Sequence, residues 1–587
     1  MNPAIATRRL PPRIATMLRL PIILLTVLLA GSWLGSAEEP GAAGRPAPLP
    51  FLLSMVHHNP GEPLFLTKYE RPAYLMTLGI NGDAARFFFA CALTYDGYEP
   101  GLVDPGGAAR AWIKRYEKNL RHLITEHQQA GLPLYPFTDI LVIPREVMAK
   151  YGSEMKDDKG QLSIARERTK AIVVAQIDEL FRRFPELGGL TLRFGETYLT
   201  DTPHHLGGRP VHSVDDHVTL VGLLREEVCV KRNRKLFYRT WDFGGLHTRP
   251  DQYRALSDRI EPHPNLLFSV KHSGDDFLRN VPFNRTIGLG RHRQIIEVST
   301  MQAGCYGKGA YPYYIGRGVL HGWSEMADRK GLSSLVGSPM FAGMFVWPRG
   351  DGWSGPYIPN EFWSDLNMQV LCGFARRPWL TDEQLFREHC RERLHLDEAG
   401  TAKLYELCLL SEQAVLDGAQ SVAGNVQAWW QRDDTYTDPP LAKVPPERFQ
   451  AMRDEKAASV AAWRRIEALA REVRLPVAAD QDYLEVSSTY GRIHFSICDV
   501  LWRLDMLMRG PVDDTAKAAM RQGLATYDAL WQEWRTLERE HACCPTLYVT
   551  RFPQTFPPTW RETPEKRPGT PSWDTPMVAR CRALLGK

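Results

Sequence analysis

The stretch that decides the fold is Gly189-Leu-Thr-Leu-Arg-Phe-Gly-Glu196-Thr-Tyr198. This short run of β-forming residues follows a segment with helical periodicity and a Pro-Glu-Leu-Gly-Gly turn, and it leads to a carboxylate. Buried parallel strands read as near-continuous apolar runs, and (β/α)8 barrels place their chemistry at the C-terminal ends of such strands. The pattern predicts a barrel strand that presents Glu196 as a catalytic acid. The alternative is a strand-end Glu196 that forms an ion pair with Arg193.

Strand-like and helix-like runs alternate on both sides of this stretch. The expected strands are residues 51–58, 86–93, 134–142, 189–198, 235–242, 265–271, 294–301 and 339–347. The expected helices between them are residues 108–130, 164–184, 214–231, 251–260 and 319–328. Eight strands that are mostly separated by helices predict an α/β fold, a (β/α)8 TIM barrel. A doubly wound sheet is the alternative, but the glycine-rich phosphate motifs that would favour it are absent from the sequence.

After Pro378 the strand-like runs stop, and segments with 3.6-residue periodicity follow at residues 381–393, 398–420, 446–471, 482–508 and 515–540. Thr381-Asp-Glu-Gln is typical of a capping box at a helix start. The predicted organisation is a signal peptide (1–37), a linker (38–50), the barrel (51–378), an all-α C-terminal domain (379–544) and a Pro-rich tail (545–587). The tail is expected to be irregular.

The first 37 residues have the composition of a secretory signal. Four arginines precede an apolar run at residues 20–34, and Gly35-Ser36-Ala37 provides a small-residue cleavage site. The apolar run is short for a membrane span. These features predict a secreted or periplasmic protein without stable membrane insertion after cleavage, and an uncleaved anchor is the alternative.

The composition is that of an ordinary globular protein, with 44% hydrophobic residues, 24% charged residues and a net charge of +4. So small a net charge for 587 residues gives no reason to expect nucleic acid as a partner. The 16 Trp, 21 Tyr and 23 Phe residues suit sugar stacking, but they also suit a large core. Ten cysteines without a Cys-x-x-Cys pair predict small core residues rather than a zinc site, so no metal or cofactor is expected.

Carboxylates, cations and aromatic rings follow the expected strands, a combination that suits glycoside cleavage. One carboxylic acid protonates the leaving oxygen, while a second carboxylate activates water or attacks the anomeric carbon. The candidate catalytic residues are Glu196, Asp276 and Asp242, although Asp276 stands in a Ser-Gly-Asp-Asp sequence that could merely form a turn. The candidate substrate-binding residues are Lys271, Arg239, Trp241, His57, His58, Tyr306, Lys308, Tyr311, Trp347 and Arg349. Arg or Lys would hold the carboxylate of an acidic sugar. Glu297, within its strand, is expected to be a barrel-interior partner of Lys271.

Three segments are similar to a known family. Leu267-Phe-Ser-Val-Lys271-His-Ser-Gly-Asp-Asp276-Phe277 and Ile295-Ile-Glu297-Val resemble the barrel of the α-glucuronidases, glycoside hydrolase family 67. Residues 362–383 resemble that family's entry into its helical C-terminal domain. The resemblance covers roughly residues 189–410.

The resemblance implies a barrel with a helical domain and an inverting mechanism on a glucuronic-acid-bearing xylan fragment. Glu196 would match the family's acid, Asp276 one of its water-activating carboxylates, and Lys271 a contact to the substrate carboxylate. The family's other carboxylate stands in a Gln-Glu-Tyr step after strand seven. Here that place reads Gln302-Ala-Gly-Cys-Tyr306, so the glutamate is missing.

The missing glutamate leaves three functions open. The first is an exported glycosidase that acts on an oligosaccharide from a plant or algal polysaccharide, with Asp276 or Asp242 as base. The second is a carbohydrate-binding barrel that has lost hydrolysis. The third is a uronate lyase with Tyr306 or His272 as base and Arg239 neutralising the carboxylate. Apolar faces on the C-terminal helices would serve either a homodimer or the support of the barrel.

Overall fold

The computed structural model of the chain describes residues 45–57, 66–85, 92–193, 202–241, 246–274, 277, 279, 281–300, 309–350, 356–426, 439, 441–547 and 575–586. The chain divides into two compact units, Met1–Arg45 and Pro46–Lys587. Every element described below belongs to the second unit. The predicted signal peptide lies outside the described residues, and the predicted domain boundaries remain predictions.

Eight parallel strands form the central sheet, and they follow one another around it in chain order. The sheet order is β2-β1-β10-β9-β8-β7-β5-β3, so strands that are consecutive in the chain lie side by side except β2 and β3, which stand at the two ends, and β1 lies beside β10. The strands are β1 (Phe51–His57), β2 (Gly82–Asp83), β3 (Phe137–Asp139), β5 (Gly189–Arg193), β7 (Lys235–Arg239), β8 (Leu266–Lys271), β9 (Gln294–Ser299) and β10 (Phe341–Gly350).

Backbone bonds between β2 and the approach to β3 join the two ends of this sheet. Asp83 forms a parallel bridge with Leu134, and the Tyr135 amide donates to the Asp83 carbonyl at 2.7 Å. The Phe137 amide donates to the Ala85 carbonyl at 2.9 Å. The eight strands therefore close into a barrel, and the predicted TIM-like fold class is confirmed.

Alternation along the strands separates two hydrophobic cores. On β1, Leu53 and Met55 belong to a cluster made mainly of strand residues that fills the barrel, whereas Leu52 and Val56 belong to the core outside it. Successive side chains of a strand point to opposite faces, so a continuous apolar run feeds both cores at once. The near-continuous apolar strands that the sequence predicts therefore supply side chains to both cores.

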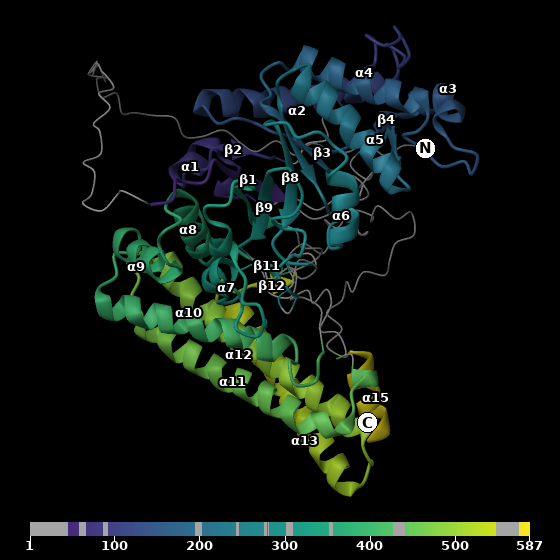
Figure 1. The fold of residues 1–587 in the computed structure, drawn as a ribbon. Coiled ribbons are helices and arrows are strands. Elements are labelled where there is room, and N and C mark those ends of the chain that lie inside the picture. The colour runs from purple at the N-terminus through teal and green to yellow at the C-terminus, as the bar shows by residue number, and fades with distance from the viewer. Residues whose placement is uncertain are drawn as a thin grey trace, which may run out of the picture. The chain divides into compact units, whose positions relative to one another are not determined.

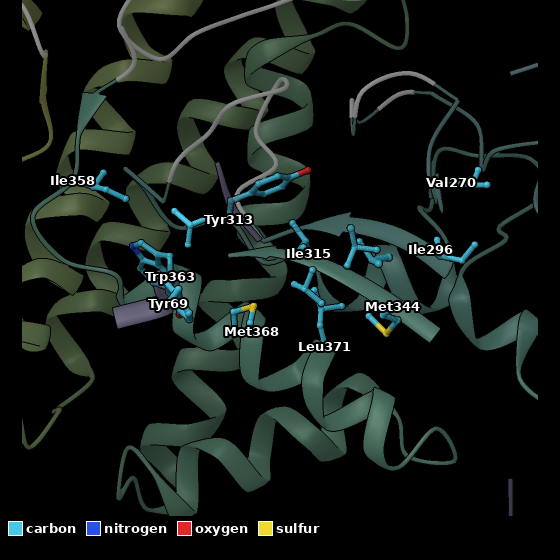
Figure 2. Close-up of a cluster of buried hydrophobic side chains, with 14 of the residues drawn as sticks. Tyr69, Val270, Ile296, Tyr313, Ile315, Met344, Ile358, Trp363, Met368 and Leu371 are labelled. Atoms are coloured by element: carbon cyan, nitrogen blue, oxygen red, sulfur yellow. The ribbon is translucent and has the colours of Figure 1, made fainter. Parts of the chain in front are cut away.

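The helices of the barrel region lie along the chain between these strands, except for the last one, which follows β10. They are α1 (Pro72–Thr77), α2 (Ala108–Ala130), α3 (Arg145–Met155), α4 (Glu167–Arg183), α5 (Val214–Leu224, continued by a π-helical turn at Arg225–Val230), α6 (Pro250–Ser257), α7 (Gly316–His321) and α8 (Phe362–Arg376). Figure 2 shows part of the outer core, in which Met368 and Leu371 of α8 share the interior with Ile296 and Met344 from the strands. A short antiparallel ribbon pairs β4 (Val142–Pro144) with β6 (His205–Gly207).

The C-terminal region is helical. Its helices are α9 (Asp382–Glu392), α10 (Glu398–Ala419), α11 (Phe449–Glu472), α12 (Ala478–Arg509), α13 (Asp514–Glu540) and α15 (Pro576–Leu584). The long helices α10 to α13 pack against one another in chain order (Figure 1). The predicted capping box is confirmed, because the Thr381 side chain accepts from the Gln384 amide and the Gln384 side chain accepts from the Thr381 amide.

Direct contacts join the barrel region to these helices. The Trp363 indole donates to the Ser487 hydroxyl at 2.9 Å, and the Tyr483 hydroxyl donates to the Gly309 carbonyl at 2.6 Å. The outer hydrophobic core runs without a break from the strands into α10, α11 and α12. The C-terminal helices therefore support the barrel.

Some predicted elements differ from the structure. The second barrel strand is Gly82–Asp83, which precedes the predicted run, and residues 86–91 of that run lie outside the described residues. Glycine suits position 82 because the neighbouring side chains pack closely against the backbone there. A Cβ atom would lie 2.6 Å from side-chain atoms of both Leu53 and Tyr135. The third run divides into β3 and β4 at Leu141, whose φ is 57°.

Two further predictions, one of a helix and one of the irregular tail, also differ from the structure. The helix expected at 319–328 stops at His321, because Gly322 has φ 91° and a Cβ atom there would lie 2.2 Å from the Arg329 backbone. The tail that was expected to be irregular contains α15. Residues 548–574 of that tail lie outside the described residues.

The cysteines agree with the interpretation as core residues. Among the eight cysteines that the structure describes, all are free thiols and only Cys543 is not buried. In the same part of the chain, no helix is both long enough and apolar enough to cross a membrane.

Candidate active site at the C-terminal end of the barrel

The structure brings four predicted substrate-binding residues together inside the barrel, near the C-terminal ends of its strands. Arg239 ends β7, Lys271 ends β8, Trp241 follows β7, and Trp347 lies on β10. All four side chains are buried. The three predicted catalytic residues Glu196, Asp242 and Asp276 lie outside the described residues, as do His58, Tyr306 and Lys308.

Arg239 forms a fully buried ion pair with Glu297 of β9. Its Nε and one terminal nitrogen each lie 2.7 Å from a different carboxylate oxygen, and the Ser269 hydroxyl donates to the same carboxylate at 2.7 Å. Burial works to raise the pKa of Glu297, but Arg239, Lys271 and Ser269 outweigh it and hold the pKa below its ordinary value. Glu297 is therefore an ionised carboxylate that Arg239 and Ser269 bind by hydrogen bonds, while its predicted partner Lys271 contributes an attractive charge.

A second buried ion pair joins β3 and β5. The Arg193 guanidinium donates to the two oxygens of Asp139 at 2.7 and 2.9 Å. The guanidinium carbons of Arg193 and Arg239 lie 5.2 and 4.9 Å from the centroid of the Phe137 ring. One aromatic ring therefore contacts both guanidinium groups.

Lys271 lies among aromatic rings. Its ammonium nitrogen is 3.9 Å from the centroid of the Trp241 ring, 4.5 Å from that of Phe277 and 5.5 Å from that of Trp347. Each ring face attracts the cation, and desolvation strengthens this attraction. Phe277 has φ 63° and is buried, although a bulky residue in this left-handed conformation is a rare outlier. Such strain persists only where the surroundings hold a residue firmly, as they do at many functional sites.

Cations and carboxylates share this buried layer. The described interior near the strand ends holds the cations of Arg193, Arg239 and Lys271 and the carboxylates of Asp139 and Glu297. Each of these carboxylates is bound bidentately by a guanidinium group.

Asn284 holds the end of the strand that carries Lys271. Its side-chain amide donates to the carbonyl oxygens of His247 at 2.9 Å and of Lys271 at 3.2 Å. Its side-chain oxygen accepts from the amide and the hydroxyl of Thr286. The side chain is thus fully engaged, and it ties the loop after β7 to the end of β8.

His272 follows Lys271 and is buried beside the Phe277 ring, 6.0 Å away between ring centroids. Neither of its ring nitrogens has a hydrogen-bond partner among the described residues. Burial lowers the pKa of His272 to about 4, so the imidazole is neutral near pH 7. A base of such low pKa is a weak one at neutral pH, which argues against its role in a lyase.

The structure places Tyr311 and Arg349 in packing contacts. The Tyr311 ring contacts Trp463 and Phe495 at 5.7 and 5.1 Å between centroids, so it packs against α11 and α12. Arg349 forms an ion pair with Glu361 at 3.2 Å and donates to the Ile358 carbonyl. These contacts favour a structural role for both residues. His57 ends β1, and its side chain is outside what the structure describes.

Several residues of this buried layer were not among the candidate site residues that the sequence indicated. Asp139 was one of many polar residues near a strand end, Ser269 carried no signal of its own, and Phe277 was noted only within the segment that resembles the α-glucuronidases. Period-two alternation on β8 places Ser269 on the same face as Lys271, and this alternation is the signal that could have found it. Among the described residues, no group of three or more His, Cys, Asp or Glu side chains is arranged to hold a metal ion.

Comparison with known proteins identifies a solved enzyme whose fold is similar to that of this chain. No protein-family model matches the chain, and no curated protein sequence matches it. Among solved structures, the chain is similar to a GH138 enzyme targeting pectin rhamnogalacturonan II, with 10% identity, a TM-score of 0.53 and coverage of 92% of this chain and 68% of that one. At this identity the likeness shows the fold alone. The barrel with its helical region is therefore the part of the architecture that this chain shares with that enzyme.

Two further structures align more weakly. Dispersin B matches with 12% identity and a TM-score of 0.32 over 51% of this chain and 91% of that one. StrH, a pneumococcal virulence factor studied in N-glycan recognition and hydrolysis, matches with 13% identity and a TM-score of 0.30 over 62% of this chain and 92% of that one. Scores this low carry no argument about the present chain.

Proposed function

We propose that this protein is an exported glycoside hydrolase whose barrel mouth binds an acidic sugar of a plant or algal glycan. The observation that carries the proposal is Lys271, a buried cation held among three aromatic rings at the strand ends. Aromatic rings provide faces for a sugar ring, and the ammonium provides a partner for a uronate carboxylate. The GH138 enzyme that shares the fold targets pectin rhamnogalacturonan II.

In this proposal Glu196 is the general acid, as the resemblance to the α-glucuronidases implies. Asp276, or Asp242, is the carboxylate that activates water. Glu297 and Asp139 are poor candidates for either role, because each is already bound by two guanidinium nitrogens. Their ion pairs instead hold the positive groups of the interior in place. An inverting reaction requires room for water between the two catalytic carboxylates.

A specific observation keeps a second candidate open, a barrel that binds carbohydrate without cleaving it. Both carboxylates that the structure describes in this layer are engaged in ion pairs. The sequence also lacks the glutamate after strand seven that the resembling family carries. A non-catalytic protein would retain the binding groups and lose the reaction.

The test is release of uronate and reducing sugar from a panel of plant and algal glycans. Release that Glu196→Gln and Asp276→Asn both abolish would support the proposal and assign the pair. Release that survives Glu196→Gln would remove Glu196 as the acid. If Asp276→Asn remains active, the same assay with Asp242→Asn decides the second carboxylate. Binding without any release would support the non-catalytic alternative.

The acidic-sugar part of the proposal has a test of its own. Lys271→Met is expected to lower kcat/KM on a uronate substrate by about tenfold to hundredfold, the usual value of a hydrogen bond to a charged group. The carboxyl-reduced form of the same substrate should be affected much less. Lys403→Met, which removes a surface lysine paired with Glu472, is the matched control. Equal losses on both substrates would contradict recognition of the carboxylate.

A further inference from the structure

A cavity outside the barrel mouth lies between α1, α8, α9 and the start of α12. Its volume is about 190 Å³. Sites for drug-sized ligands usually enclose roughly 300–1,000 Å³, so this cavity has room for a small molecule with a single ring. Its walls combine two aromatic residues, Tyr74 and Phe362, with charged and neutral polar side chains.

The charges on the cavity wall are balanced. Asp365 accepts hydrogen bonds from Lys68 and Tyr69, so its negative charge is compensated by a neighbouring ammonium group. Asp480 and Arg393 contribute one further charge of each sign. A charged ligand would bring a charge that no group on the wall compensates, whereas a neutral ligand would keep the charges balanced.

The remaining polar groups on the wall are both donors and acceptors. Gln369 makes no hydrogen bond to another described residue, so its amide is available to a ligand as donor and as acceptor. His389 is 9% exposed, and its Nδ1 atom has no hydrogen-bond partner among the described residues. Burial lowers the pKa of His389 to about 4, which makes the imidazole neutral near pH 7. Asp480 accepts from the Asn360 amide at 2.9 Å and has further lone pairs to offer.

This mixed set matches the hydroxyl groups of a sugar. Each hydroxyl group donates one hydrogen bond and accepts up to two, so it pairs equally well with a carboxylate, an amide or a guanidinium group. The Tyr74 and Phe362 rings supply apolar surface for the C–H face of a pyranose. A purely apolar ligand would leave the Gln369 amide without a partner, at a cost in desolvation.

We propose that this cavity is a second saccharide site, which binds one neutral pyranose through Gln369, Asp480 and Arg393 against Tyr74 and Phe362. The site is formed by α1, α8, α9 and α12, whereas the candidate active site is formed by the ends of the barrel strands. It therefore stands independently of the proposed reaction. In a protein that acts on a polysaccharide, such a site would hold a neutral part of the chain away from the reacting bond.

The test is calorimetric titration of the full chain with methyl glycosides of neutral hexoses and pentoses, and with tetramethylammonium as a cationic probe. Binding of at least one neutral glycoside in the millimolar range is expected. Gln369→Ala should weaken that binding at least tenfold, and Thr77→Trp, which places a large side chain at the exposed rim of the cavity, should abolish it.

Two controls separate this site from other effects. Gln413→Ala removes a glutamine that pairs with Asp417 on the surface of α10, and it should leave binding unchanged. Lys271→Met should also leave it unchanged, because that residue belongs to the barrel mouth. Failure of every neutral glycoside to bind, binding that survives Thr77→Trp, or loss only in Lys271→Met would overturn the proposal. Preference for tetramethylammonium would overturn its neutral ligand.

Discussion

Arg239 and Glu297 face each other inside the barrel, and two guanidinium nitrogens each lie 2.7 Å from a carboxylate oxygen. The side chains are 1% and 0% exposed. They come from β7 and β9, so the ion pair reaches across the intervening strand β8. Each charge is therefore tolerable in the interior only because the other is present.

Removal of one member of this pair should destabilise the protein strongly. Glu297→Gln leaves the Arg239 charge buried without its carboxylate, and we expect a loss of about 3–5 kcal/mol in the free energy of unfolding. Urea denaturation followed by circular dichroism measures it. The double variant Arg239→Met/Glu297→Leu should recover much of the loss, since neither charge of this pair is then left without the other. A single variant within 1 kcal/mol of wild type would contradict this account.

A pair of glycine substitutions tests the tight approach of β5 to β7. A Cβ atom at Gly189 would lie 2.0 Å from the Lys235 carbonyl oxygen, a backbone atom that cannot easily move. Gly189→Ala is therefore expected to cost at least about 1–3 kcal/mol, the usual range for overpacking. Gly222→Ala on α5 meets open space and should stabilise by about 0.5–1 kcal/mol through helix propensity. Thermal unfolding would show a lower Tm for the first and a higher Tm for the second, and the same direction for both would contradict the explanation.

Glu412 of α10 should make the stability of the protein depend on pH. Burial raises the pKa of this carboxyl from 4.5 to about 7, although Arg317 and Arg279 oppose the shift. Between these values the folded state keeps a proton that the unfolded state has lost. The contribution to stability is therefore greatest below pH 4.5, and it falls by up to about 3 kcal/mol as the pH rises through 7.

Unfolding free energies at pH 5 and pH 7.5 check the Glu412 prediction. Wild type should lose stability between the two values, and Glu412→Gln should lose clearly less. Glu398→Gln, on the same helix but exposed and paired with Arg387, should behave like wild type. Identical pH dependence in all three proteins would show that Glu412 does not titrate in this range.

Asn284 should act on the candidate site by positioning Lys271. Asn284→Asp replaces the donor amide by a carboxylate oxygen that would face the carbonyl oxygens of His247 and Lys271. We expect a lower Tm, corresponding to about 1–3 kcal/mol. On an acidic substrate we also expect a rise in KM larger than the fall in kcat. Asn119→Asp, on the exposed surface of α2, is the control. A changed Tm with an unchanged KM would show that Asn284 has a structural role only.

The helices were the elements whose bounds the sequence predicted most accurately. Periodicity marked α10 and α13 to within a residue or two at each end, and the capping box at Thr381 marked the start of α9. Helix formation depends on residues three or four positions apart, so a local window contains most of the information. The β2 strand was missed because Gly82–Asp83 has little strand propensity and is held by pairing with its neighbours.

The residues of the candidate site were found by their place at the strand ends, but their partners were not. The sequence indicated that Lys271 and Glu297 share the barrel interior, and it gave no sign that Arg239 would bind Glu297. It selected Tyr311 for the mouth, whereas the structure packs this ring against α11 and α12. Both differences involve contacts between segments that lie far apart along the chain.

The sequence by itself therefore determined the alternation of strands and helices, the change to an all-α region after Pro378, and the polar residues at the strand ends. Only the tertiary structure decided which of these residues meet, that β2 closes the barrel, and that Asn284 holds the end of β8. The physical reason is that periodicity and capping act between near neighbours, while the register of a closed barrel and the pairing of buried charges depend on every strand at once.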